Sequence, residues 1–353
     1  MSKKLSTQLF IILFIALIVR VITTLISAGI INSDIYSFLT TGNVLLQKTP
    51  TYPAFYFPFI FYLGAVSILL GKYIPPLLFL KFIFCLFDVG VTYFVYKLSK
   101  NLTSTIIYAL NPVMIIIIPI HGQMDSIPLF FLLWSIYAVK QKKEKLSGFL
   151  LGVAIATKPW PILFLPYFLK KAQRPAKYIS ALFVPGLTVI FHSIVTNVPV
   201  KEIITPIKNY RGIYGIWGVG SMMYTLFPSW WENNIQFFRR IFLVGFVVWT
   251  FFDKKKDFMK EFFLTMLFFF VCTPLFGIQW LSWIVPFLII QDGKSSLGRI
   301  FLMTLSVMFA FIPFDEVVPI LMNPVRESLA YAFGLLVWFS LYRRFISYRR
   351  LWT

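Results

Sequence analysis

A lone carboxylate, Asp34, follows the first long apolar segment of the chain, and a Tyr/Pro/Phe-rich stretch follows it up to Pro58. An acid in this position is either a helix-flanking group at a water–lipid interface or a general base. Tyr36, which we also include among the substrate-binding candidates, and the aromatic stretch are suited to exclude water around it. A shielded carboxylate can accept a proton from an attacking hydroxyl group. We therefore predict that Asp34 is the catalytic residue.

A second polar cluster, His121-Gly-Gln-Met-Asp125, ends another apolar run. His121 and Gln123 are suited to hydrogen-bond to a sugar or a phosphate. Asp125 is either a further substrate-binding residue or the cap of the next helix, because the residues after it favour a helix start. A His and an Asp four residues apart are weak evidence for a metal site without a further ligand motif. We therefore expect no metal and no other cofactor.

Two cations are candidates for phosphate contacts. Lys158 stands in an apolar stretch away from the basic clusters, and an isolated ammonium at membrane depth usually marks a functional cavity. The alternative is a lysine whose ammonium extends to the outer interface. Arg211 lies in a segment, 208–220, that is rich in glycine and aromatic residues. This segment predicts either an interfacial helix or a lid over an acceptor sugar.

Further polar side chains lie in or beside the apolar segments. Gln279, in the turn 273–279, presents an amide to the outer face, and we include it among the substrate-binding candidates. Arg20 and Asp88 have opposite charges in neighbouring apolar runs, which suggests a buried ion pair that fixes helix register. Lys81, two helical turns before Asp88, competes for the same carboxylate.

Composition defines the elements that must position these groups. The 353 residues are 59% hydrophobic and 13% charged, with 41 Phe, and apolar runs recur from end to end. This composition predicts an all-α polytopic membrane protein. The formal charge of +20 is typical of cytoplasmic loops rich in Lys and Arg, so it does not indicate a nucleic-acid partner. Cys85 and Cys272 lie in apolar segments and are expected to be packing residues.

The basic clusters fix a topology. All of them fall on the side of the N-terminus under two conditions. Residues 57–74 must form a surface or re-entrant helix on the outer face, and residues 146–169 must form a hairpin broken at Lys158-Pro-Trp-Pro161. Counting spans then gives about twelve transmembrane helices, with both termini cytoplasmic. Outer segments include a first loop, 32–74, and a long loop, 196–236. We predict one domain, 1–353, with a catalytic module at 1–170 and a variable helical module at 177–353.

The order of the motifs resembles that of the GT-C glycosyltransferases. It is closest to the mannosyltransferases that use polyprenol-phosphate-mannose, and the catalytic subunit of GPI mannosyltransferase I has a similar layout. The likeness rests on Asp34 after the first span, Thr49-Pro-Thr-Tyr-Pro53, Asp88, Asn111-Pro112, His121-Gly-Gln-Met-Asp125, Ala156-Thr-Lys-Pro-Trp-Pro161 and Gln279-Trp-Leu-Ser-Trp-Ile-Val-Pro286.

The resemblance implies a GT-C-type fold and an inverting transfer of a sugar, with mannose favoured. The donor would be a polyprenyl- or dolichyl-phosphate sugar, and the acceptor a glycan, glycolipid or protein hydroxyl outside the cytoplasm. By likeness Asp34 is the base, and Asp125 matches the family's acid at an outer helix end. The GPI enzymes carry Asp-x-Asp where this chain has Asn32-Ser-Asp34, so Asp34 would act alone.

The membrane implied is the cell membrane, or the endoplasmic reticulum in a eukaryote. A partner subunit is left open by the sequence. A polytopic transporter or lipid-linked sugar flippase is the main alternative function, since it would explain the same outward polar groups and buried charges. Transporters commonly show paired halves with matching broken helices, and the break at Lys158 has no counterpart in the second half. A non-catalytic membrane subunit of an assembly complex is the third interpretation.

Overall fold

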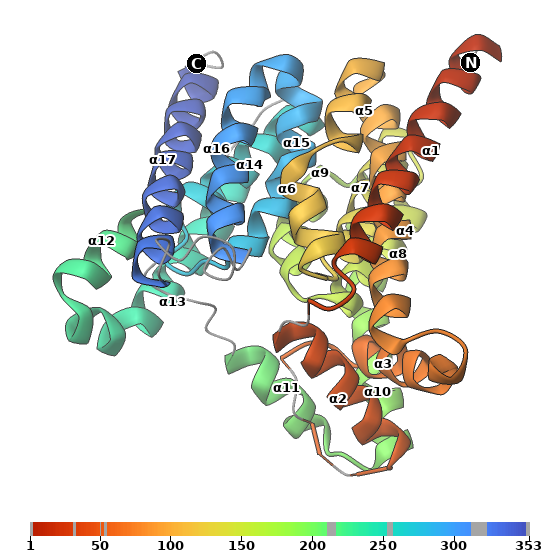
Figure 1. The fold of residues 1–353 in the computed structure, drawn as a ribbon. Helices are drawn as coiled ribbons and strands as arrows, with labels where there is room; N and C mark the ends of the chain where they lie inside the picture. Colours follow the sequence, from red (N-terminus) through yellow and green to blue (C-terminus); the bar gives the residue numbers. More distant parts are fainter. Residues whose placement is uncertain are drawn as a thin grey trace. The chain divides into compact units, whose positions relative to one another are not determined.

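The structure is a computed structural model, and it describes residues 3–30, 33–49, 51–52, 55–209, 217–252, 257–311 and 323–350. Within these ranges every regular element is a helix (Figure 1). The chain forms two compact units: Met1–Leu110 with Ile117–Tyr210, and Asn111–Ile116 with Arg211–Thr353. The predicted functional modules, 1–170 and 177–353, stay a prediction.

The first unit carries most of the candidate site residues. Its helices are α1 (Lys3–Ile26), α2 (Ser33–Leu46), α3 (Phe59–Leu69), η1 (Leu70–Lys72), α4 (Pro76–Ser99), α5 (Leu102–Ala109), η2 (Ile116–Ile120, from its second residue), α7 (Ser126–Lys140), α8 (Glu144–Thr157), η3 (Trp160–Phe164), α9 (Leu165–Lys171), η4 (Pro175–Tyr178), α10 (Ser180–Thr196) and α11 (Val200–Asn209).

The second unit is also helical. It contains α6 (Pro112–Ile115), α12 (Gly218–Leu226), α13 (Pro228–Phe252), α14 (Phe258–Cys272), η5 (Ile278–Trp280), α15 (Leu281–Asp292), η6 (Gly293–Ser296), α16 (Leu297–Phe311) and α17 (Asn323–Arg350). The predicted outer loop 196–236 stays a prediction; it includes the start of α13 at Pro228. The loop also holds α11 and α12.

Six helical segments in the described part of the chain are long and apolar enough to cross a membrane, which makes the protein a multi-pass membrane protein. They are Leu5–Ile26, Pro76–Ser99, Leu102–Ile120, Pro175–Thr196, Ile278–Phe311 and Ser328–Arg350. Two shorter apolar helices, Phe59–Lys72 and Ser126–Lys140, add to these. The count of about twelve spans, the side of the termini and the GT-C-type fold stay predictions.

Two local features place the candidate site. The predicted break is present: α8 ends at Thr157, Lys158 has an extended backbone, and η3 follows Pro159. In the first loop, α2 packs on α3 through glycines, because a Cβ on Gly42 would lie 2.3 Å from a backbone atom of Gly64. Two glycines at a crossing let helix backbones approach closely. The α2–α3 pair therefore forms a compact hairpin that carries Asp34.

Candidate active site

Asp34 lies in the first turn of α2, half-buried. The N-terminus of a helix carries partial positive charge, which favours an anion there. Its Oδ2 accepts a hydrogen bond of 2.5 Å from Nε2 of Gln123. In the described part of the chain, no Lys or Arg comes within salt-bridge distance of this carboxylate. The carboxylate is therefore held by a neutral amide rather than by a cation among the described residues.

Gln123 links Asp34 to His121. Its amide nitrogen has two hydrogens, and it also lies 3.1 Å from Nδ1 of His121. Because the amide donates, Nδ1 accepts, and neutral His121 carries its proton on Nε2. Burial lowers the pKa of His121 to about 4, although Asp34 raises it and Lys81 lowers it further. His121 is thus a neutral donor at neutral pH.

The other end of the Gln123 side chain has an unused acceptor. Gln123 is only 1% exposed, and no described group hydrogen-bonds to its Oε1. A buried carbonyl without a partner is uncommon and invites a ligand or a water. A hydroxyl group of a bound sugar is a donor of the right kind.

The turn that presents these side chains has an unusual backbone. η2 is a π-helix that contains Pro119, and π-helical turns are frequent at functional sites. The helix ends at Ile120. In the turn that follows, Gly122 has a φ of +81°, which lies in the left-handed region that favours glycine. A Cβ on Gly122 would lie 2.1 Å from Cδ1 of Ile35. Gly122 therefore lets the turn pack directly against the residue that follows Asp34.

Asp125 and Lys158 form a buried ion pair. Nζ of Lys158 lies 2.9 and 2.8 Å from the two carboxylate oxygens, and the two residues are 7% and 0% exposed. Asp125 occupies the N-cap position of α7 but makes no side-chain cap. The capping interpretation is therefore wrong, because the carboxylate is directed to Lys158. The ring of Tyr56 lies 5.5 Å from the same ammonium, as a cation–π contact.

Aromatic side chains of the first loop pack against α10. The ring of Tyr52 stacks on Phe61, and both contact the His192 ring of α10. The predicted shielding of Asp34 by the Tyr52–Phe61 segment stays a prediction. Tyr36 differs, since its side chain is 68% exposed. It does not enclose Asp34 in this structure.

A separate charge cluster lies among α1, α4 and α5. Nε of Arg20 lies 2.6 Å from Oδ2 of Asp88, and the hydroxyl of Tyr108 donates to Oδ1 at 2.6 Å. Arg20 also donates to the carbonyl of Ala109 at 2.6 Å. Lys81 does not compete for Asp88, because its ammonium binds the carbonyl oxygens of Ser27 and Ile120.

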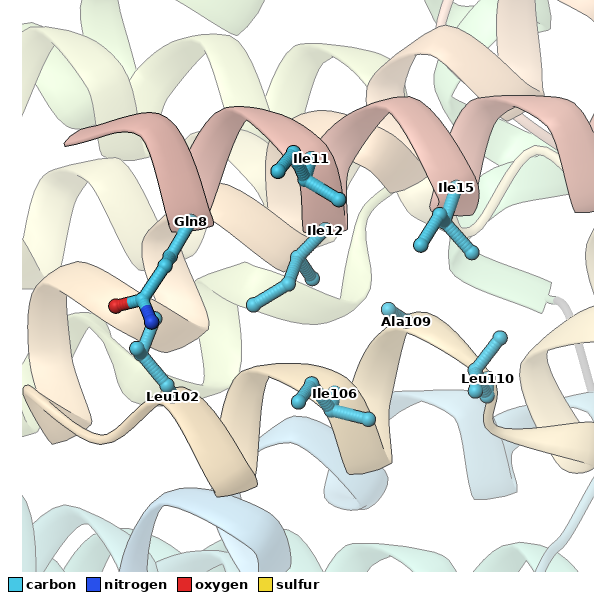
Figure 2. Close-up of a pocket in the computed structure, with 8 residues that line it drawn as sticks. All are labelled: Gln8, Ile11, Ile12, Ile15, Leu102, Ile106, Ala109 and Leu110. Atoms are coloured by element: carbon cyan, nitrogen blue, oxygen red, sulfur yellow. The ribbon is translucent and has the colours of Figure 1, made fainter. Parts of the chain in front are cut away.

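The remaining predictions fall elsewhere. Gln279 is half-buried in η5 of the second unit, and Arg211 lies outside the described residues. The part of the chain that the structure describes holds no group of three His, Cys, Asp or Glu side chains able to bind a metal. A pocket between α1 and α5 is lined by apolar residues and Gln8, and none of the candidate site residues lines it (Figure 2).

Sequence reasoning missed two contributors to these clusters. The hydroxyl of Tyr108 donates a hydrogen bond to Oδ1 of Asp88, but a tyrosine in an apolar run carries no distinctive signal. Gly122 was part of a recognised motif, and a glycine after His121 and before Gln123 is typical of a helix end with a positive φ. That signal was sufficient to predict the sharp turn.

Apolar helices that enclose a half-buried acid, an amide and an imidazole define a multi-pass membrane protein with a polar site. The chain belongs to glycosyltransferase family 87, whose sequence profile matches residues 51–274, more than half of the chain. The protein is therefore a glycosyltransferase, with a sugar donor and an acceptor. The matched residues include His121, Gln123, Asp125 and Lys158 but begin after Asp34.

One curated relative is a mannosyltransferase. GPI mannosyltransferase 1 of Eremothecium gossypii is 33% identical over 90 residues, which are 24% of this chain and 22% of the relative. The match thus spans about a fifth of that protein's length. No solved structure matches the chain significantly.

Proposed function

We propose that the protein transfers a sugar from a polyprenyl-phosphate donor to an acceptor hydroxyl on the extracytoplasmic face, with inversion at the anomeric carbon. The observation that carries this proposal is the Asp34 carboxylate. It is half-buried and fixed by Gln123 at 2.5 Å. No cation in the described part of the chain pairs with it. A carboxylate that is held in place and is only half-buried has the geometry of a general base.

The reaction is a single displacement. The acceptor oxygen attacks the anomeric carbon, its proton passes to Asp34, and the bond from carbon to the donor phosphate oxygen breaks. Attack occurs opposite the leaving group, so the configuration inverts. General-base assistance of this kind contributes about 10²–10⁴-fold to the rate. The leaving phosphomonoester needs positive potential around it rather than an acid.

Several residues are placed to bind the substrates. The Nε2 hydrogen of His121 is a neutral donor for a sugar or phosphate oxygen, and Oε1 of Gln123 is a free acceptor among the described groups. Nζ of Lys158 directs two of its three hydrogens at the oxygens of Asp125, and both residues are buried. We therefore assign the Lys158–Asp125 pair to the wall of the site. Arg211, Tyr36 and Gln279 stay proposed substrate contacts, and no metal is part of the proposed mechanism.

Mannose is the sugar that we propose first. Its support is the similarity to the E. gossypii mannosyltransferase, which extends over 24% of this chain. The family membership supports glycosyl transfer but not a particular donor.

The test is a transfer assay on purified protein in lipid nanodiscs. Polyprenyl-phosphate mannose and polyprenyl-phosphate glucose are supplied separately with glycolipid or lipid-linked oligosaccharide acceptors, and donor consumption is measured. Asp34→Asn should lower the turnover number about 10²–10⁴-fold while the protein stays folded. Asp257→Asn, an acid-to-amide change at an exposed helix cap in the other unit, is the matched control and should retain activity.

Full transfer by Asp34→Asn would refute the assignment of the base. Consumption of the glucose donor alone would show that the transferred sugar is glucose rather than mannose. If neither donor is consumed but the lipid-linked sugar crosses the bilayer in proteoliposomes, the flippase alternative is correct.

A further inference from the structure

Lys81 is a buried cation whose charge no described acid neutralises. It lies in α4 with 0% exposure. Its Nζ is 2.9 Å from the carbonyl oxygen of Ser27, 2.9 Å from that of Ile120 and 3.4 Å from Oγ of Ser27. The other two deeply buried cations of this unit, Arg20 and Lys158, each have a carboxylate partner. An ammonium without a counter-charge is energetically unfavourable inside a membrane protein, and such a group usually serves a function.

The two carbonyl groups belong to the ends of two helices. Ser27 directly follows α1, and Ile120 is the last residue of η2. Terminal carbonyl groups have no intrahelical partner and carry partial negative charge. The ammonium therefore joins the end of α1 to the end of η2. Oγ of Ser27 strengthens the same junction by donating to the carbonyl of Pro119 at 3.1 Å.

This junction lies at the base of the candidate site. His121 immediately follows Ile120, and the chain passes from Ser27 to Asp34 within seven residues. A Cβ on Gly122 would lie 3.2 Å from Cε of Lys81 and 2.1 Å from Cδ1 of Ile35. The lysine stem, the Gly122 backbone and the first turn of α2 are thus packed in one layer. Movement of the Ile120 carbonyl would displace the Gln123 amide from Asp34.

We propose that Lys81 is a positioning residue for glycosyl transfer, because its ammonium fixes the His121–Gln123 turn against the start of α2. This role rests on the proposed function of Asp34 as the base. Lys81 also acts on His121 through its charge and favours the neutral imidazole. A reacting group displaced by about 1 Å can lose about 10²-fold in rate, so a small shift of the turn is sufficient to matter.

A cross-linking experiment tests the position directly, whether or not the protein is active. Asp34→Cys and Gln123→Cys are combined with Cys272→Ser, which removes an exposed thiol, while buried Cys85 is kept. A short bifunctional methanethiosulfonate reports whether positions 34 and 123 are adjacent. The pair is compared in chains with Lys81, Lys81→Met, Lys81→Arg and Asp88→Asn. The last variant changes a buried charge on the same helix that does not touch the turn.

We expect cross-linking with Lys81, Lys81→Arg and Asp88→Asn. In Lys81→Met it should fall to the background of the Asp34→Cys single variant. In otherwise unchanged chains, Lys81→Met should lower kcat about 10²-fold with a smaller change in KM. Lys81→Arg should restore most of that loss, because a guanidinium also donates to both carbonyl groups.

Unchanged cross-linking in folded Lys81→Met would overturn the proposal, whatever happens to activity. The same holds if Asp88→Asn abolishes cross-linking to the same extent, because the effect would then reflect general destabilisation. If cross-linking follows the expected pattern but the unmodified protein consumes neither donor, the positioning role stands and the proposed function fails. The two hypotheses are therefore separable.

Discussion

Asp88 and Asp34, both in the first unit, are carboxylates of different character. Asp88 is 0% exposed and pairs with the Arg20 guanidinium at 2.6 Å, with Tyr108 on its other oxygen. Asp34 is half-buried and accepts a hydrogen bond from the Gln123 amide at 2.5 Å. Asp88 is paired with a cation and contacted by donors on both oxygens, whereas Asp34 is held by an amide and has an accessible side.

In this unit, the partner of a carboxylate, rather than its depth of burial, distinguishes a structural acid from a catalytic one. A guanidinium stabilises the carboxylate and removes its capacity to accept a proton from a substrate. An amide orients the carboxylate without cancelling its charge. Asp125 belongs with Asp88 by this criterion, since both of its oxygens contact Lys158. Asp125 lies only two residues from Gln123. The turn that holds Asp34 through Gln123 therefore also carries the ion-paired Asp125.

Arg20→Met should give the largest effect on stability. It leaves Asp88 buried without a cation, which typically costs about 3–5 kcal/mol. Thermal unfolding in detergent should show a strongly lowered Tm. The turnover number per folded molecule should change little, because neither Arg20 nor Asp88 contacts the Asp34 cluster through any hydrogen bond that the described residues show.

The matched comparison is Asp34→Asn, which should abolish transfer with little change in Tm. If Arg20→Met removes activity at unchanged Tm, or if Asp34→Asn unfolds the protein, the distinction between the two acids is refuted.

The sequence predicts much of this arrangement from charge and apolar pattern. Opposite charges in adjacent apolar runs indicate the Arg20–Asp88 pair, and the prolines after Lys158 predict the helix break that the structure contains. These inferences succeed because a charge or a proline has few tolerable environments at membrane depth.

The partners of Lys81 and Asp125 were beyond such reasoning. Lys81 has a carboxylate within its own helix, so pattern alone favours Asp88. Its actual acceptors are the carbonyl groups of Ser27 and Ile120, which become available only where two helices end together. Asp125 has the local features of a helix cap, yet the distant Lys158 attracts its carboxylate. Backbone acceptors and contacts between distant segments leave no mark in local sequence.

Lys158→Met should lower Tm less than Arg20→Met does, and the second substitution Asp125→Asn should reverse most of that loss. The single variant strands the Asp125 carboxylate, so Tm and activity should both fall. Adding Asp125→Asn removes the stranded charge and should restore most of the stability and activity if the pair only shapes the wall. A folded double variant that still transfers no sugar would show that Lys158 itself contacts the donor phosphate. The measurements are Tm in detergent and donor consumption.

The smallest expected effect is the pH dependence of stability that His121 causes. It tests whether water is excluded from the Asp34 cluster, as the geometry indicates. Burial lowers the pKa of folded His121 to about 4 from an ordinary value of 6.5. Between these pH values the unfolded chain binds the extra proton, so the imidazole contributes full stability above pH 6.5 and loses it as the pH falls toward 4. The loss is at most about 3 kcal/mol.

His121→Gln should flatten the fall of Tm across this window, while Gln123 keeps its bond to Asp34. Parallel curves for the two proteins would mean that His121 is hydrated, and that its neutral Nε2 hydrogen is not reserved for the sugar or phosphate.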